Sequence, residues 1–334
     1  MLFNILLWIS LFSFAMASNN HAVLIAGSNG YDNYRHQADI CHAYNILSRG
    51  AIQDENIILM TYDDIANHPE NPFPGKIFNS PSSTEAPAID LYENCQKATN
   101  KYTGDDVNSD NFLAVLTGNQ STVPKGKKVL NSTENDDVFI NFADHGGPGI
   151  LEMPSGPFLR KSQLLNALQI MYNKKMYKKL VIYIEACESG SIFDGFDLNS
   201  LNIYAVTAAN SNQPSYGTYC PPNDYVYYNN QYKALNTCLG DLFSVNWMEN
   251  ADKINKNHSR ETLETQYQIV KNETNLSSPQ QFGELSITSD GIQMYEGNGY
   301  VNTSRNFKHE ISLNQWAIPS YLKFYKNLRK NSNK

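Results

Sequence analysis

Short, continuous apolar runs alternate with segments of helical periodicity along most of this chain. Five runs are typical of β-strands: His21–Gly27, Asn56–Tyr62, Val138–Ala143, Val181–Ile184 and Asn202–Ala208. Helical spacing of apolar residues predicts helices over Gln37–Ser48, Asn111–Leu116, Leu164–Met176, Ser244–Asn250 and Ser259–Glu273. Strands that are apolar on both faces are typical of parallel sheets covered by helices. The pattern therefore predicts an α/β fold with a mostly parallel β-sheet flanked by helices on both faces.

Two further segments have no place in that sheet. The stretch Gln213–Thr237 is polar and contains Pro214, Pro221 and Pro222, which predicts a loop. The last segment, Leu313–Lys334, has a helical apolar pattern, and Pro319 is expected to kink that helix or delay its start.

The first residues read as a targeting segment. Met1–Ala17 has no charged side chain and ends in Ala15-Met16-Ala17, which predicts a signal peptide over residues 1–17 with cleavage before Ser18. An uncleaved anchor is the alternative, although the segment is short for a spanning helix. We expect a chain of the secretory pathway that is not stably inserted in a membrane after the signal peptide is removed.

Net charge and glycosylation sequons narrow the classes of partner and of cellular location. The formal charge of −7 and the absence of a basic stripe argue against a nucleic-acid partner. Asn-x-Ser/Thr sequons predict glycosylation, with only some of them used, at Asn119, Asn131, Asn257, Asn272, Asn275 and Asn302. The sequence gives no indication of oligomeric state.

Five cysteines leave an odd one in an oxidising compartment. Cys220 and Cys238 flank the Pro-bearing loop and are the best candidates for a disulfide. Cys41 falls in an apolar helix pattern and is expected to be buried and free, while Cys95 stays unassigned. Since His36, Cys41 and His42 lack structural zinc spacing, we expect neither a metal nor a cofactor.

Two of the predicted strands end in reactive side chains. Val138–Ala143 leads into Asp144-His145-Gly146-Gly147, and Val181–Ile184 leads into Glu185-Ala186-Cys187. Open α/β sheets build their sites at the carboxyl ends of strands. Separately, each residue is more often a packed side chain than a catalytic one. Together they indicate a cysteine nucleophile with a histidine base, and the glycines would let a substrate carbonyl approach backbone N–H groups.

Seven stretches give this arrangement a specific resemblance. They are Ala26–Gly30, Asn33–Asp39, Tyr62–Asn67, Tyr102–Val107, Ala143–Gly147, Glu185–Gly190 and Gly240–Met248. By these stretches, the chain resembles the legumain (asparaginyl endopeptidase) family of caspase-like cysteine peptidases, and the resemblance covers roughly Val23 to Gly283. The resemblance implies a caspase-like catalytic domain over residues 18–290, followed by a short tail over 291–334 in place of a full helical prodomain.

The resemblance also implies roles for single residues. Cys187 would be the nucleophile, His145 its proton-transfer partner and Asn33 the residue that orients the histidine, with the N–H groups of Gly146 and Cys187 as the oxyanion hole. The pocket for an asparagine side chain falls on Arg35, His36, Glu185, Ser215 and Asp241. Arginine can bind the amide carbonyl, and the carboxyl groups can accept from the amide nitrogen. A structural ion-pair cluster is the alternative.

The implied activity is hydrolysis of peptide bonds after Asn through a Cys thioester, and after Asp only at acidic pH. Peptide and protein substrates would be the partners, and the lysosome, the vacuole or the exterior the location. A peptide ligase or transamidase that uses the same residues is the nearest alternative, because an amine can replace water. From a different class, the chain could be an inactive glycosylated binding protein that keeps the scaffold.

Overall fold

The computed structural model describes residues 19–50, 52–257 and 259–296. The predicted signal peptide (1–17), the Asn302 sequon and the predicted helix Leu313–Lys334 lie outside the described residues. So does the tail beyond residue 296.

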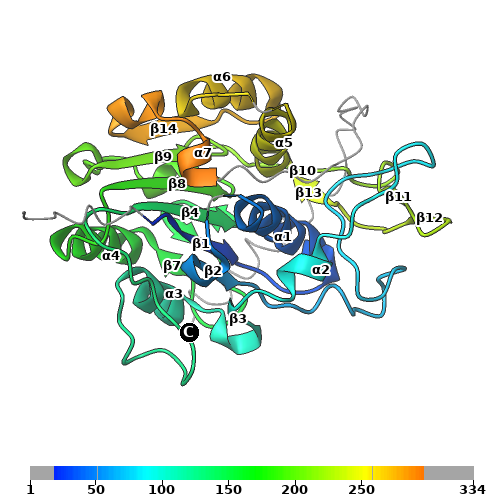
Figure 1. Ribbon diagram of the computed structural model, residues 1–334, viewed down its shortest axis with the longest axis horizontal. Helices are drawn as coiled ribbons and strands as arrows, with labels where there is room; N and C mark the ends of the chain where they lie inside the picture. Colours follow the sequence, from blue (N-terminus) through cyan, green and yellow to red (C-terminus); the bar gives the residue numbers. More distant parts are fainter. Residues whose placement is uncertain (1–18, 51, 258, 297–334) are drawn as a thin grey trace, which may run out of the picture.

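A seven-stranded sheet forms the centre of the molecule, with strand order β14-β9-β8-β4-β1-β2-β3 (Figure 1). Every neighbouring pair in it is parallel except β14 against β9, which is antiparallel. Its members are β1 (His21–Ala26), β2 (Ile57–Met60), β3 (Asn100–Tyr102), β4 (Asp137–Ala143), β8 (Lys179–Glu185), β9 (Ile203–Thr207) and β14 (Gln280–Gly283). The mostly parallel sheet is therefore confirmed.

Shorter strands form three small sheets away from the centre. They are β5 (Gly146–Gly147), β6 (Ile150–Leu151), β7 (Leu159–Arg160), β10 (Gly217–Thr218), β11 (Tyr225–Tyr228), β12 (Gln231–Ala234) and β13 (Gly240–Asp241). Strands β5, β6 and β7 follow the catalytic-histidine candidate along the chain, whereas β10 pairs with β13 and β11 with β12.

Helices cover both faces of the central sheet, as predicted (Figure 1). The core that α1, α2, α5 and α6 build on one face is separate from the core that α3 and α4 build on the other. The helices are α1 (Tyr34–Ser48), α2 (Tyr92–Cys95), α3 (Ser109–Leu116), α4 (Lys161–Asn173), α5 (Leu242–Lys256), α6 (Leu263–Glu273) and α7 (Gln293–Glu296).

Alternation along β4 and β8 shows why the central strands are apolar throughout. Phe139 and Tyr183 point into the core on the α1 side, where both rings pack edge-on against the fully buried Trp247 of α5. Their strand neighbours Ile140 and Ile182 point into the opposite core. Because successive side chains of a strand face opposite ways, both sets are buried only when both faces are covered.

Several boundaries differ from the sequence prediction. Helix α1 begins at Tyr34 rather than Gln37, because nearly all of its surface is buried and its polar first turn carries no apolar signal. Strands β3 and β14 were not predicted, since Asn100–Tyr102 and Gln280–Gly283 are short, mostly polar edge strands. The predicted loop Gln213–Thr237 contains the β11–β12 hairpin.

The expectation that Cys41 is free is wrong. Cys41 of α1 and Cys95 of α2 form a disulfide with a Cα–Cα distance of 5.4 Å. The two helices pack together in one core, which brings the sulfurs within bonding distance despite a separation of 54 residues. Cys220 and Cys238 are also joined, and Cys187 is the free cysteine of the described residues.

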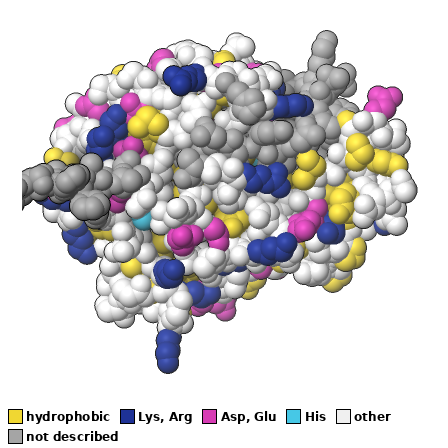
Figure 2. Space-filling model, in the orientation of Figure 1, with side chains coloured by type: hydrophobic (Ala, Val, Ile, Leu, Met, Phe, Trp, Pro, Cys, Tyr) yellow, Lys and Arg dark blue, Asp and Glu magenta, His cyan; other side chains and the backbone are white. Residues whose placement is uncertain are grey.

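The surface carries charges of both signs. On the face in Figure 2, Lys and Arg side chains are interspersed with Asp and Glu over the described residues. The side chains of Asn119, Asn131, Asn257, Asn272 and Asn275 are all exposed, so each sequon is accessible to a glycan. Among the described helices, none combines the length and apolar character that crossing a membrane requires.

Candidate active site

The two reactive residues follow neighbouring strands of the central sheet. Strands β4 and β8 pair in parallel up to Ala143 and Glu185, and beyond that pair the Asp144 N–H donates to the Glu185 carbonyl at 3.0 Å. His145 and Cys187 each lie two residues past this last matched pair. The parallel register therefore delivers both side chains to the same edge of the sheet.

Gly146 holds the two strand exits in close contact. A Cβ at Gly146 would lie 2.4 Å from the Cys187 carbonyl oxygen and 2.8 Å from the Ala186 Cβ. No side chain fits there, so only glycine allows the histidine loop to pack against the cysteine loop. Ser191 adds a second link, since its hydroxyl accepts from the Gly149 N–H at 2.8 Å.

Cys187 is partly buried, and its environment keeps the thiol protonated. The thiol lies 3.7 Å from the Ser215 carbonyl oxygen, to which it donates weakly. Burial raises the pKa of Cys187 to about 12, and the acidic side chains of Glu188 and Glu185 add to this. A thiol of this kind becomes a nucleophile only when a base removes its proton during attack.

His145 contacts Asn33, the residue that the family resemblance implies as its partner. The His145 Nε2 lies 3.0 Å from the Asn33 Oδ1, while the Asn33 Nδ2 donates to the Asn29 carbonyl at 3.0 Å. The second bond fixes the amide so that its oxygen faces the imidazole. Nε2 then carries the proton, and Nδ1 is the nitrogen of the neutral ring that can accept one.

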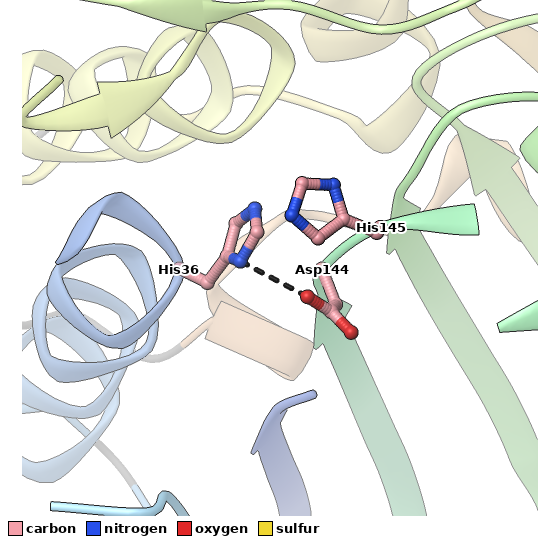
Figure 3. A group of neighbouring side chains, drawn as sticks. All are labelled: His36, Asp144 and His145. Atoms are coloured by element: carbon pink, nitrogen blue, oxygen red, sulfur yellow. Dashed lines mark ion pairs between the residues drawn. The ribbon is translucent and has the colours of Figure 1, made fainter. Parts of the chain in front are cut away.

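His36, on helix α1, lies beside His145 (Figure 3). Its ring meets that of His145 edge-on at 4.9 Å, and its Nδ1 lies 3.0 Å from Asp144 Oδ1 and 2.6 Å from the Ser28 hydroxyl. Burial and the nearby Arg35 hold the pKa of His36 well below its usual range. Burial and Glu152 hold the pKa of Asp144 well above its own. Burial therefore disfavours the charged form of both side chains.

His36, Asp144 and His145 are also the described residues with the geometry closest to a metal site. Their ligand atoms lie within 4.8 Å of one another. Both imidazoles nevertheless have hydrogen-bond partners of their own, Ser28 for His36 and Asn33 for His145. These contacts support the catalytic histidine candidate from behind its ring, whereas the two buried Asp144 oxygens accept no hydrogen bond among the described residues.

The predicted pocket residues gather beside Cys187. The Arg35 Nε donates to Asp241 Oδ1 at 2.9 Å, and both side chains are buried. Ser244 donates its N–H and its hydroxyl to Glu185 Oε2 at 3.0 and 3.2 Å. Glu185 Oε1 is a buried oxygen without a hydrogen bond among the described residues. One guanidinium and two carboxyl groups from three separate segments thus meet in one place.

Ser215 links Cys187 to the segment that carries Asp241. Its carbonyl accepts from Cys187, and the next residues pair with the segment that carries Asp241: Gly217 is opposite Asp241, and the Leu242 N–H donates to the Tyr216 carbonyl at 2.8 Å. His36 Nε2 also lies 3.5 Å from Asp241 Oδ2, so the five residues predicted for the pocket are linked through Asp241 and Ser215 to Cys187.

Sequence reasoning overlooked three buried polar residues that support this site. Ser28 bonds His36, while Asp39 and Asn79 bond the segment before Asp241. The signal that could have found Asp39 is its position one helical turn after Arg35 on a helix whose faces are all buried.

The accumulation of buried carboxyl groups makes stability depend on pH. Burial raises the pKa of Glu185 and of Glu296 from 4.5 to about 8, and raises those of Asp39, Asp144 and Asp241. A group with a raised folded-state pKa contributes its full stability below its unfolded pKa, and this stability is lost as pH rises through the folded value. The window for the two glutamates is therefore from 4.5 to about 8.

We expect Cys187→Ser protein to melt roughly 5 to 10 °C lower near pH 8 than near pH 5, as measured by calorimetry. Glu296→Gln should reduce that difference, because it removes a buried titrating group distant from the site. Glu93→Gln is the matched control, since the Glu93 side chain is 69% exposed. A melting temperature that rises from pH 5 to pH 8 would contradict the assignment of protonated buried carboxyls.

Comparison with known proteins gives the chain its relatives. A family profile described as the peptidase C13 family matches residues 20–298. Legumain of Canavalia ensiformis is 45% identical over 290 residues, which cover 83% of this chain and 57% of that protein. The vacuolar-processing enzyme delta-isozyme of Arabidopsis thaliana is 46% identical over 297 residues, covering 87% of this chain and 61% of that protein.

A solved structure is also similar. The crystal structure of caspase-1 from Spodoptera frugiperda matches with a TM-score of 0.43 and 7% identity, covering 80% of this chain and 87% of that one. The chain spans a little over half the length of the curated relatives it matches. By the match over residues 20–298 and the identity of 45% to its relatives, this chain belongs to the peptidase C13 family.

Proposed function

We propose that the chain is a cysteine endopeptidase that hydrolyses peptide bonds after asparagine. The observation that carries the proposal is the meeting, at one sheet edge, of a free cysteine, a histidine held by Asn33 and a buried pocket of Arg35, Glu185 and Asp241. Membership of the peptidase C13 family supports the same conclusion. The substrates are peptides and proteins with Asn at the cleaved position.

Attack begins with the neutral thiol of Cys187. As Sγ bonds to the scissile carbonyl carbon, His145 accepts the thiol proton, and the carbonyl oxygen becomes an oxyanion stabilised by the N–H groups of Gly146 and Cys187. His145 then returns the proton to the leaving amine, which gives a thioester. Water, deprotonated by His145, cleaves the thioester and releases the acid and the free thiol.

Charge in the pocket explains the choice of asparagine. The amide oxygen of the substrate accepts from Arg35, and its NH₂ group donates to Glu185 and Asp241. An aliphatic side chain would leave these buried groups without partners, at about 1–3 kcal/mol for each unsatisfied group. Asparagine is therefore selected by the penalty on substrates that cannot pair with all three.

The pH dependence of cleavage after aspartate tests the assignment of the pocket. An ionised Asp side chain would face Glu185 and Asp241, whereas a protonated Asp resembles the amide and can donate its O–H. We expect Asp peptides to be cleaved near pH 4 and cleavage to fall by about tenfold for each pH unit above the substrate pKa of about 3.9. Asn peptides should lack that dependence in the same range. Faster cleavage after Asp near neutral pH would contradict the pocket assignment.

The same assay separates hydrolysis from ligation. One Asn peptide with an added amine nucleophile gives either the free acid or a transpeptidation product, and mass spectrometry distinguishes them. We expect mainly the acid. Dominant ligation would make the chain a transamidase with the same residues, and no turnover by a folded, thiol-intact protein would favour a binding protein that keeps the scaffold.

The cellular setting belongs to the same proposal. A signal peptide over residues 1–17, a catalytic domain over 18–290 and a short tail over 291–334 are consistent with a chain of the secretory pathway. Two disulfides among the described residues favour an oxidising compartment. Several of the relatives are named vacuolar-processing enzymes. We therefore place the enzyme in the vacuole or lysosome, or outside the cell.

A further inference from the structure

Asp39 is a buried acid behind the pocket that the proposed chemistry does not use. It lies on α1, one turn after Arg35, and is 1% exposed. Its Oδ2 accepts from the Asp241 N–H at 3.2 Å, and its Oδ1 accepts from Asn79 Nδ2 at 2.7 Å. The first bond holds the backbone of Asp241, and the second links Asp39 to Asn79.

The fit between Asp39 and that segment is tight. A Cβ at Gly240 would lie 3.0 Å from Asp39 Oδ1 and 2.8 Å from Asn79 Nδ2, so the backbone there rests directly on the two side chains. Asn79 also donates to the Leu239 carbonyl at 2.8 Å. Asp39 and Asn79 together therefore hold residues 239–241 from the helix side.

Further buried contacts connect Asn79 to helix α5 through His42. Asn79 Oδ1 lies 2.8 Å from His42 Nδ1, and His42 Nε2 lies 3.0 Å from Asp252 Oδ2 on α5. His42 stands on the same helix as Asp39, less than one turn further along. A continuous set of buried polar contacts thus runs from the pocket acid through Asp39 and Asn79 to α5.

The charged groups around Asp39 disfavour the state in which both Asp39 and Asp241 are ionised. Asp241 faces it from β13 and Glu185 from β8, while Arg35 is the cation paired with Asp241. Asp39 accepts from the backbone N–H of Asp241 at 3.2 Å, so the two acids are close neighbours, and ionising both would place two buried carboxylates beside one guanidinium. Since Arg35 stabilises the charge of Asp241, the proton belongs on Asp39.

We propose that Asp39 is a positioning residue that, as a neutral carboxyl group, holds Asp241 against Arg35 and thereby sets the upper pH limit of asparagine binding. The inference rests on the proposed function and adds a residue that does not itself touch the substrate. When Asp39 loses its proton, two carboxylates oppose each other beside one guanidinium, and the pocket acid is displaced. Burial and Asp241 hold the pKa of Asp39 well above its usual range, so Asp39 loses its proton only at a pH well above that of an ordinary aspartic acid.

Asp39→Asn is the direct test, because asparagine keeps the size and one acceptor oxygen but cannot ionise. For an Asn peptide, we expect the KM of the unsubstituted enzyme to rise about tenfold or more from pH 6 to pH 8. In Asp39→Asn, KM should rise at most about threefold, through Glu185, and its value at pH 6 should match the unsubstituted enzyme. The effect belongs in KM, because Cys187 and His145 are untouched.

Asp137→Asn is the matched control. Asp137 is also a buried acid with a raised pKa, but it lies at the opposite end of β4 from the site. This variant should keep the pH profile of the unsubstituted enzyme. The rate at which iodoacetamide alkylates Cys187 serves as a second readout, which a change confined to the pocket leaves unaltered.

The outcomes separate the two proposals. If the unsubstituted enzyme does not cleave after Asn at any pH, the proposed function fails. If it does and Asp39→Asn keeps the same steep rise of KM, the assignment to Asp39 is overturned and Glu185 controls the limit. Asp39→Ser is the second variant. Its KM should be higher than that of the unsubstituted enzyme at pH 6 and should change little from pH 6 to pH 8. If neither variant folds at pH 5, Asp39 is required for folding itself and the positioning role is overturned.

Discussion

Replacing Cys187 with alanine is expected to lower kcat/KM for an Asn peptide by about 10⁵-fold, the largest effect of any single substitution. Without the sulfur no thioester forms, and the pocket and oxyanion hole leave only a small residual rate. The measurement is steady-state cleavage by purified, glycan-trimmed protein. Unchanged melting behaviour would show that the loss lies in the chemistry, since the hydrogen bond of the Cys187 thiol within the described part of the chain is a long one, 3.7 Å to the Ser215 carbonyl.

His145→Ala should be almost as damaging, and the double variant no worse than Cys187→Ala alone. Two residues that act as one unit give strongly non-additive losses, because removing either disables the same step. Losses that add fully in the double variant would mean that the cysteine and the histidine act independently. The shared edge of β4 and β8 would then be a structural coincidence.

Arg35→Gln is expected to reduce kcat/KM for an Asn peptide by about 10²- to 10³-fold. The Arg35 guanidinium is paired with Asp241 at 2.9 Å, so its loss leaves this buried acid with only the longer contact to His36 at 3.5 Å, and also removes the donor to the substrate amide. Breaking a buried pair in this way is expected to be worth about 3–5 kcal/mol. Arg260→Gln, at an exposed position, is the matched control and should behave like the unsubstituted enzyme.

Alkylation of Cys187 by iodoacetamide distinguishes a pocket from a structural ion-pair cluster. If Arg35 serves recognition, the small reagent should still alkylate Arg35→Gln, slowed only modestly by the loss of a cation that lowers the pKa of the Cys187 thiol, although cleavage of Asn peptides falls by about 10²- to 10³-fold. If Arg35 is only a structural element, alkylation, melting temperature and cleavage should all change together, whichever peptide is offered.

The central strands, and the positions of His145 and Cys187 at their ends, could be predicted from the sequence because a fully buried parallel strand gives an uninterrupted run of apolar residues. Val138–Ala143 and Val181–Ile184 both have that signal, and parallel pairing of neighbouring strands then fixes where His145 and Cys187 lie. Edge strands lack it: Gln280–Gly283 is half-buried and mostly polar, so nothing in its composition separates it from a loop.

Two other features were less visible for identifiable reasons. The β11–β12 hairpin turns at Asn229 and Asn230, which have φ values of 48° and 61°, and an Asn-Asn pair between tyrosine-rich runs is a recognisable turn signal. The Cys41–Cys95 disulfide joins segments that meet only after α1 and α2 pack. An apolar helix pattern such as that around Cys41 is typical of a buried free thiol, so the sequence alone does not indicate this pairing.

The support behind the pocket could not be predicted in the same way. Asp39, Asn79 and Ser28 are ordinary polar residues in the sequence, and their significance comes from being buried together against residues 239–241 or His36. Burial of a polar side chain requires partners, and those partners come from distant segments whose proximity depends on the whole fold. Only the three-dimensional arrangement identifies them.

Mapping the adduct of a thiol-reactive Asn probe by mass spectrometry tests the central claim most directly. One adduct is expected, on Cys187, formed faster than with the matching Ala probe, and absent from Cys187→Ser protein. Modification of Cys187→Ser protein at the same rate, or equal reaction with the Asn and Ala probes, would contradict a cysteine peptidase with an asparagine pocket.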